Sequence, residues 1–426
     1  MNHAPVSAVA ANGRWRVVLL LMGYAAIAHF NRVGISVAGS EVFIKQLGIS
    51  EVRMGWVYTA FLIVYTIGML PGGWLIDRIG AAKALTWLGL SMGTFVALTG
   101  TLGWFTTGPH SLWLGLLVIR GLAGICSAPL HPGAAHVVHD LMPDHRRATA
   151  NGMVTAGALI GIACCYPVFG WLMDRLTWPW AFIASGLTLI GYGRLWRRFA
   201  SPTLPAPDHS ARTTSTESAE NSRAAWSALV RQRNLWLLTL SYAAYSYFQY
   251  LFFYWMTNYF ETVLQVPVVE SRRSSFYIML AQGVGMAIGG VSTDAICRRL
   301  GTTRGRRSIV MTGMGLGAVL GLLGVLVAGQ WNVTICMAIS MAALGMCEGV
   351  FWTTATDIGG KSRGLSGAFM NTGGNIGGLI SPVLSPLLAQ ALGWPGAIAV
   401  ACAISGLGGV VWFFIKPPSQ VAEAVI

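Results

Sequence analysis

Long apolar stretches recur along almost the whole chain, and they limit its fold more than any other feature. A helix needs about 20 apolar residues to cross a bilayer, because the hydrocarbon core is about 30 Å thick. Charged and turn-forming residues divide the sequence into twelve such stretches. We therefore predict an all-α membrane protein with transmembrane helices at residues 16–38, 52–76, 82–105, 111–137, 148–173, 179–199, 234–260, 272–297, 308–328, 332–357, 363–390 and 394–415.

The composition excludes an ordinary soluble enzyme. Only 10% of the 426 residues are charged, whereas a soluble globular chain has about 25%. The net charge of +13 would suit nucleic acid, but the sequence has no compact basic region to bind it. In membrane proteins, Lys and Arg gather in cytoplasmic loops instead. We expect the lipid bilayer, and not nucleic acid, as the protein's large partner.

One polar segment divides the predicted helices into two groups of six. Residues 200–232 are rich in Pro, Ser, Thr and Arg, a composition typical of a flexible linker. We predict an N-terminal six-helix bundle at 1–199, a cytoplasmic linker at 200–232 and a C-terminal six-helix bundle at 233–426.

The distribution of basic residues predicts the orientation in the membrane. With the N-terminus inside, the cytoplasmic segments hold 21 of the 28 Lys and Arg residues, and the outer loops hold five. Such a bias favours both termini in the cytoplasm. We expect a multi-pass protein of the cell inner (plasma) membrane, with Arg32 and Arg120 as the two basic residues that lie within the membrane and belong to neither side.

Several motifs occur twice, separated by 216 or 217 residues, which is close to half the length of the chain. Repeated matches at one offset indicate an internal duplication, and two parallel six-helix repeats build a common transporter architecture. The paired motifs are Gly72-Gly73-x-x-x-Asp77 with Gly289-Gly290-x-x-x-Asp294, and Trp178-Pro179-x-Ala181 with Trp394-Pro395-x-Ala397.

The segment Gly73-Trp-Leu-Ile-Asp77-Arg78-Ile-Gly80-Ala-Ala-Lys83 resembles the loop 2–3 signature of the major facilitator superfamily. The resemblance implies twelve transmembrane helices in two pseudo-symmetric bundles, in a transporter that works by alternating access. An acid at a helix end beside bases in a glycine turn can act as a conformational latch. We expect Asp77, Arg78, Lys83 and Asp294 to latch the outward-open state; plain topology-setting charges are the alternative.

Within that superfamily the chain resembles the anion:cation symporter family, which includes bacterial sugar-acid permeases. Typical members carry Asp where Asn31 stands and Glu where Ser127 stands, and the resemblance implies that these acids bind the coupling protons. Both acids are absent here. The matching motifs are Asn31-Arg32-x-x-Ile35-x-Val37-Ala38, Tyr65, Arg120-Gly121-x-x-Gly124, Ala128-Pro129-x-x-Pro132, and Gly367-Ala-Phe-Met-Asn371-Thr-Gly-Gly-Asn375-x-Gly377-Gly378.

The residues themselves also favour an anion site. A charged side chain inside the bilayer is costly unless it faces a polar cavity or a partner, and Arg forms two-bonded contacts to carboxylates. We predict that Arg120, assisted by Arg32, neutralises a carboxylate-bearing solute. Alternatively, either Arg reaches the interface with its head group or fixes a helix end.

Three side chains are candidates for a proton carrier. His131 lies on the same helix face as Arg120 and Ser127, and His29 precedes Asn31; histidine titrates near neutral pH. Glu348 is the one acid near the centre of a predicted helix, which makes it a functional candidate. The alternatives are a neutral hydrogen-bonded histidine and a buried structural carboxyl.

Polar groups in the later helices could orient a hydroxylated solute. Asn371 and Asn375 are four residues apart on a glycine-rich helix, and Tyr65 and Tyr250 could frame the ligand. Contacts between helices are the alternative for the asparagines, and simple packing for Tyr250. Glycine pairs such as Gly373-Gly374 are interpreted as close-packing points, since no strand precedes them as in a phosphate loop.

We therefore predict a secondary active transporter of a small organic anion, a hexonate, hexuronate or similar sugar acid, coupled to protons by symport. An anion exchanger or facilitative carrier without proton coupling is the alternative, as is an anion sensor that does not transport. We expect no enzyme activity, catalytic residue, metal or cofactor, because no nucleophile–base pair or metal cluster is visible. We expect a monomer.

Overall fold

The computed structural model describes residues 11–200, 204, 227, 229–360 and 363–416. These residues are almost entirely helical, and no strand occurs among them. They form two compact units, Met1–Asp208 and His209–Ile426. The predicted linker at 200–232 lies mostly outside the described residues.

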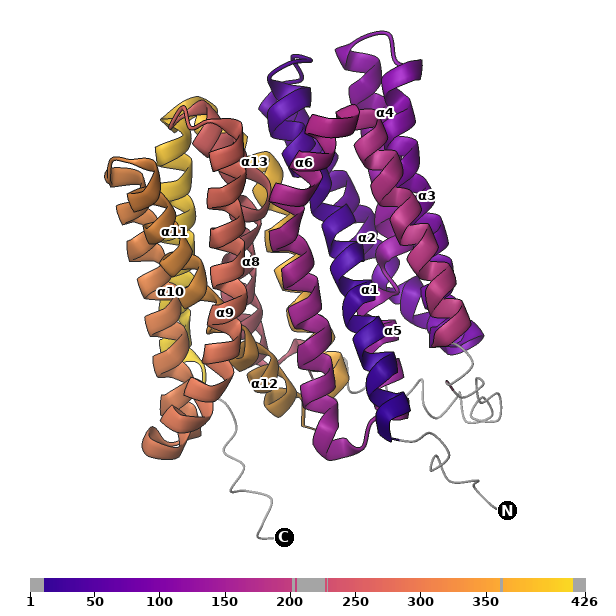
Figure 1. Cartoon of the computed structure of the whole chain (residues 1–426). Helices are drawn as coiled ribbons and strands as arrows, with labels where there is room; N and C mark the ends of the chain where they lie inside the picture. Colours follow the sequence, from indigo (N-terminus) through magenta and orange to yellow (C-terminus); the bar gives the residue numbers. More distant parts are fainter. Residues whose placement is uncertain (1–10, 201–203, 205–226, 228, 361–362, 417–426) are drawn as a thin grey trace. The chain divides into compact units, whose positions relative to one another are not determined.

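Unit 1 consists mainly of long helices, which Figure 1 labels along the chain. The π-helical turn η2 continues α1, and the short helix α5 follows α4 after a two-residue break. The bounds are α1 Ala11–Ala38, η2 Gly39–Ile44, α2 Glu51–Ile79, α3 Ala81–Phe105, α4 Pro109–Ser127, α5 Leu130–Leu141 and α6 Asp144–Phe199.

Unit 2 repeats this arrangement. The short helix α12 follows α11 after a break at Met346 and Cys347, in the same way that α5 follows α4. The bounds are α8 Arg233–Thr262, α9 Val268–Leu300, α10 Thr302–Leu326, α11 Gln330–Gly345, α12 Glu348–Gly359, α13 Arg363–Val411 and the 3₁₀ turn η6 Trp412–Phe414.

The described helices account for twelve membrane crossings. Nine helical stretches are long and apolar enough to cross a membrane. Two of them, one within α6 and one that runs from α13 through η6, have 51 and 50 residues, which is enough for two crossings each. The aromatic-rich α8 has 30 residues and is long enough to cross, although it is not among the nine. The predicted helices begin and end within about six residues of these bounds, but those predicted as single helices at 111–137 and 332–357 are each broken in two.

Both long helices contain one break, and both breaks lie at the duplicated Trp-Pro motif. Thr177 has φ 64° and ψ 161° immediately before Trp178. Gly393 has φ 71° and ψ 164° immediately before Trp394. This backbone region is essentially restricted to glycine, so the motif marks a tight turn between two crossings in each unit.

The two units use the same pattern of helix packing. In unit 1, α6 packs against α1 and α3, and α2 packs against α4. In unit 2, α13 packs against α8 and α10, and α9 packs against α11; Figure 1 shows α10 and α11 side by side. The internal duplication seen in the sequence is therefore present in the fold.

Glycines bring corresponding helices into backbone contact. A Cβ added at Gly161 of α6 would overlap the Ala26 carbonyl of α1. A Cβ added at Gly377 of α13 would overlap the Ala243 carbonyl of α8. The glycine-rich run of α13 is thus a packing surface, as predicted, because small residues let membrane helices approach closely.

Candidate functional site

A break between α4 and α5 shapes the candidate site in unit 1. Pro129 and Pro132 have no backbone N–H, so the regular helical hydrogen bonds cannot form there. The chain turns tightly instead, with the Ala128 amide donating to the Ile125 carbonyl at 3.3 Å. The turn places Ser127 at the end of α4 and His131 at the start of α5 on one pocket.

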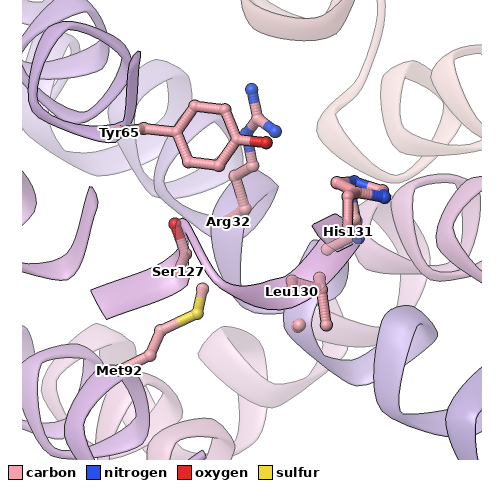
Figure 2. Close-up of a pocket in the computed structure, with 8 residues that line it drawn as sticks. Arg32, Tyr65, Met92, Ser127, Leu130 and His131 are labelled. Atoms are coloured by element: carbon pink, nitrogen blue, oxygen red, sulfur yellow. The ribbon is translucent and has the colours of Figure 1, made fainter. Parts of the chain in front are cut away.

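Figure 2 shows this pocket, which is partly open to solvent and has a free volume of about 10 Å³ for water. Helices α1, α2, α3 and the α4–α5 turn all contribute to its lining. The Arg32 and Tyr65 side chains lie together, and His131 stands across from them. The lining residues are Ala28, His29, Arg32, Tyr65, Met92, Ser127, Leu130 and His131.

Two aromatic rings of α2 hold the Arg32 side chain. Phe61 and Tyr65 are one helical turn apart, and their rings stack with centroids 6.2 Å apart. The guanidinium carbon of Arg32 is 5.3 Å from the Phe61 centroid and 5.2 Å from the Tyr65 centroid. Such cation–π contacts use the ring faces. They fix the cation at the wall of the pocket, where its N–H donors can serve an anion.

Phe61 is itself fixed by the packing of α2 on α4. A Cβ added at Gly124 would overlap the Phe61 carbonyl oxygen, so only glycine allows this approach. The Arg-Gly-x-x-Gly motif of α4 therefore supports the aromatic wall behind Arg32.

Arg120 is placed differently from Arg32. Its side chain is 1% exposed, and it is not among the lining residues of the pocket. One terminal nitrogen donates to the Arg32 carbonyl at 2.7 Å, and the other to the Asn31 carbonyl at 3.4 Å. Its guanidinium carbon is 4.9 Å from the Phe61 centroid. Arg120 thus holds the backbone of α1 at the point where Arg32 projects.

From the sequence we expect Arg120 to be the main partner of the solute and Arg32 its assistant. In the structure Arg32 lines the pocket and Arg120 lies behind it. Direct contact between Arg120 and a solute stays a prediction.

The two residues that replace the family's acids bond to their own helices. Asn31 is buried and donates from Nδ2 to the Ile27 carbonyl at 2.9 Å. Ser127 lines the pocket and donates from Oγ to the Gly124 carbonyl at 2.8 Å. Neither side chain titrates in the physiological range, so neither can carry a proton as an acid would.

Two histidines lie against one another in the same pocket. The ring centroids of His29 and His131 are 5.2 Å apart, in an edge-to-face arrangement. His29 is buried, whereas the His131 side chain is exposed. His29 Nδ1 lies 2.9 Å from the Ala25 carbonyl oxygen. Sequence reasoning singled out each histidine separately but could not foresee their contact.

Glu348 begins α12, directly after the break that follows α11. Its Oε1 accepts a hydrogen bond from the Tyr242 hydroxyl and another from Trp352 Nε1, each 2.8 Å long. Tyr242 comes from α8, so the carboxyl group joins α8 to α12. These contacts fit a structural carboxyl and also a carboxyl that holds a proton on its other oxygen.

The other predicted contacts of unit 2 lie on α8 and α13. Tyr250 packs near Phe253 and Tyr254, with centroids 5.4 and 6.2 Å apart. A Cβ added at Gly378 would lie 3.1 Å from the Tyr250 ring. Asn371 and Asn375 are half-buried and one turn apart on α13.

The predicted latch is only partly within the described side chains. The Asp77 side chain lies outside them, and Arg78, Lys83 and Asp294 are exposed. Gly80 links α2 directly to α3 with φ 85°, which explains the glycine of the motif.

Sequence reasoning missed an ion pair in unit 2. Arg306 Nη1 of α10 lies 2.6 Å from Asp357 Oδ2 of α12. The two residues are 51 positions apart in the sequence, and such spacing alone does not predict their contact.

The profile of the family described as "Major Facilitator Superfamily" matches residues 21–358 and 299–424, which together span nearly the whole chain. The chain belongs to the Major Facilitator Superfamily. The predicted fold, twelve helices in two pseudo-symmetric bundles, is confirmed, and the protein is a multi-pass membrane transporter and not an enzyme.

Individual relatives match along most of their length. The "Probable sulfoacetate transporter SauU" of Cupriavidus necator is 29% identical, over 94% of this chain and 93% of its own. The "Probable galactarate/D-glucarate transporter GudP" of Bacillus subtilis is 26% identical, with 85% and 83% covered. The "D-galactonate transporter" of Escherichia coli is 26% identical, with 96% and 97% covered. Two of these three relatives are named as sugar-acid transporters, which belong to the branch of the superfamily that the sequence resembles.

A solved structure supports the fold independently. The bacterial homologue of the human lysosomal transporter Spinster, in an inward-facing and unoccupied conformation, has a TM-score of 0.76 to this protein. The similarity covers 95% of this chain and 97% of that one, at 15% sequence identity. At this identity the likeness concerns the fold alone.

Proposed function

We propose that this protein transports a small organic anion, a sugar acid such as a hexonate or hexaric acid, by alternating access and coupled to protons. The observation that carries the proposal is the Arg32 guanidinium, held by two aromatic rings at the wall of a pocket. A carboxylate is the natural partner for such a group, because Arg binds it with two parallel hydrogen bonds.

The names of the relatives support an acidic, oxygen-rich solute. Galactarate, glucarate and galactonate carry carboxylates, and sulfoacetate carries a carboxylate and a sulfonate. A fork of Arg donors can bind either acid group. Tyr65 lies beside Arg32 and offers a hydroxyl for the polar part of the solute. In unit 2, Asn371, Asn375 and Tyr250 stay the predicted contacts for sugar hydroxyls.

We further propose the inner (plasma) membrane as the location, with both termini in the cytoplasm, and a monomer as the working form. The excess of Lys and Arg in the segments assigned to the cytoplasm supports the orientation. One chain carries both six-helix repeats, which supports the monomer.

An exchanger or facilitative carrier is the second candidate. It is favoured by Asn31 and Ser127, which bond to backbone carbonyls and cannot titrate at the positions of the family's acids.

The test uses the purified protein in liposomes that contain unlabelled solute, with labelled D-galactonate, D-glucarate or sulfoacetate outside. We expect counterflow of at least one sugar acid. We expect Arg32→Ala to weaken its binding at least about thirtyfold, since truncating one partner of a desolvated charge pair costs about 2–5 kcal/mol. Arg32→Lys should recover part of the affinity, because it keeps the charge but not the fork.

A matched control is available on the same helix as Tyr65. Arg53 also lies over an aromatic ring, with its guanidinium carbon 5.5 Å from the Trp113 centroid, but it is outside the pocket. Arg53→Ala should leave counterflow unchanged. Absence of counterflow for every sugar acid, or full counterflow by Arg32→Ala, would overturn the proposal; preference for sulfoacetate alone would replace the solute class.

A further inference from the structure

We infer that His29 and His131 together form the proton-binding site of this transporter, and that anion binding at Arg32 and proton binding at the pair favour one another. The inference rests on the proposed function and extends it. It starts from the contact between two histidine rings of different helices, in the pocket that is also lined by Arg32 and by Ser127, which stands at the position of one of the two missing acids.

The hydrogen bond of His29 defines which atom can take the proton. A carbonyl oxygen only accepts hydrogen bonds, so the Ala25 carbonyl requires a hydrogen on His29 Nδ1. In the neutral ring Nε2 then carries the lone pair. The same hydrogen bond fixes the orientation of the His29 ring, because it holds one ring nitrogen on the Ala25 carbonyl.

The route for the proton is provided by the second histidine. His29 is buried, at 7% exposure, whereas His131 is exposed and lines the open pocket. His131 can therefore exchange protons with water in the pocket. Its ring touches the ring of His29, which places a buried and an accessible titratable group side by side.

The charged and titratable groups around the histidine pair come from several helices. Helix α1 supplies His29 and Arg32, α2 supplies Tyr65, and α5 supplies His131. Helix α3 contributes Met92 to the lining, and α6 contributes nothing to it. Arg120 of α4 lies behind α1, bonded to its carbonyls. Among the described residues, no acid lines this pocket.

This arrangement couples the two ligands by charge. In the empty pocket a protonated histidine would stand beside the permanent charge of Arg32, and like charges disfavour one another. A bound carboxylate supplies the negative charge that offsets both. By linkage, the proton must then strengthen anion binding by the same factor by which the anion strengthens proton binding.

The contact between the rings also limits the stoichiometry. Two imidazolium ions with ring centroids 5.2 Å apart repel each other, so the pair takes up one proton in preference to two. One anionic charge and one proton then move together as a neutral unit. The histidine pair differs chemically from the two acids of typical family members. A histidine is charged when it has bound a proton, whereas an acid is charged when it has lost one.

The test measures protons taken up when the anion binds. Calorimetric titration of the whole purified protein with D-galactonate is carried out at one pH in phosphate and in Tris, whose ionisation heats differ. The difference in observed heat gives the protons bound per anion. We expect proton uptake by the wild type, up to one proton per anion, and, when the titration is repeated at other pH values, an affinity that falls up to about tenfold per pH unit as the pH rises.

Three variants locate the proton. His29→Asn keeps an amide donor for the Ala25 carbonyl but cannot titrate, and His131→Asn removes the exposed member. The double variant should bind the anion more weakly, with heats that no longer depend on the buffer and an affinity that no longer depends on pH. His136→Asn is the matched control, since His136 lies on the same helix but is exposed and pairs with Asp140 at 3.1 Å. It should behave as the wild type.

The outcomes separate this inference from the proposed function. A wild type that neither binds nor exchanges any sugar acid overturns the proposed function. A wild type that binds the anion without proton uptake overturns only the histidine site. The histidine site alone is also overturned if the double variant keeps the full proton uptake, or if Glu348→Gln removes the proton uptake while both histidines are intact.

Discussion

Two arginines of unit 1 lie in different surroundings. Arg32 lies on the faces of Phe61 and Tyr65 at the edge of a pocket. Arg120 is buried and donates to the main-chain carbonyls of Asn31 and Arg32. We propose that the first binds the solute and that the second holds the helix turn that carries the first. Residue type alone does not separate these roles.

A double-mutant cycle tests this division of labour. If Arg120 acts only through Arg32, then Arg120→Ala should reduce anion affinity in the wild type but not further in an Arg32→Ala background, because the two effects are not independent. Calorimetric affinity for D-galactonate is the measurement.

Stability gives a second readout for the same cycle. Arg120→Ala should also lower the melting temperature more than Arg32→Ala does, since it removes buried charge-assisted hydrogen bonds that contribute about 1.5–3 kcal/mol each. Additive losses of affinity would instead mean that Arg120 contacts the anion directly, as predicted from the sequence.

At the scale of elements, interruptions of helices matter as much as the helices. The sequence predicts single helices over 111–137 and 332–357, yet the structure breaks each one, at Ala128–Pro129 and at Met346–Cys347. These breaks place Ser127 and His131 on the pocket, and Glu348 at a helix start. Hydrophobic length predicts a crossing but carries no information about a break inside it.

The positions of crossings were predictable because the bilayer thickness fixes helix length. The partners of the site residues were not. The contact of His29 with His131 depends on how α1 packs on α5, and the bonds of Arg120 depend on which carbonyls of α1 face α4. A single sequence does not determine either. The resemblance to a transporter family pointed to Arg32 and Arg120, but not to which of them lines the pocket.

The turn within α6 yields a prediction at this scale. Thr177 occupies the backbone region where Gly393 stands in the other unit, and a side chain there costs about 1–3 kcal/mol. Thr177 is also exposed, so its side chain contributes little packing. Thr177→Gly should therefore raise the melting temperature of the protein in detergent, by a stabilisation of about 1 kcal/mol.

A matched substitution should have the opposite sign. Thr155 is exposed in a regular part of α6, where glycine is unfavourable relative to most residues. Thr155→Gly should lower the melting temperature. A decrease for Thr177→Gly of the same size would show that the turn does not strain its residue.

At the scale of the whole molecule, the duplication constrains the orientation of both units together. Six crossings are an even number, so each unit begins and ends on the same side of the membrane, and both units must agree on that side. In both units, Lys and Arg are more frequent on the side assigned to the cytoplasm. In unit 1 the outer loops hold Lys45, Arg53 and Arg175, and in unit 2 only Arg272 and Arg273. The remaining basic residues outside the helices fall in segments assigned to the cytoplasm.

Chemical labelling of intact cells tests this orientation with one site for each side. Gln46 is exposed in the turn before α2, which we expect outside, and Arg304 is exposed at the start of α10, which we expect inside. A membrane-impermeant maleimide should label Gln46→Cys in intact cells but label Arg304→Cys only after lysis. The wild type sets the baseline for the seven native cysteines. The reverse pattern would place both termini outside, because the crossing number fixes every other loop once these two are known.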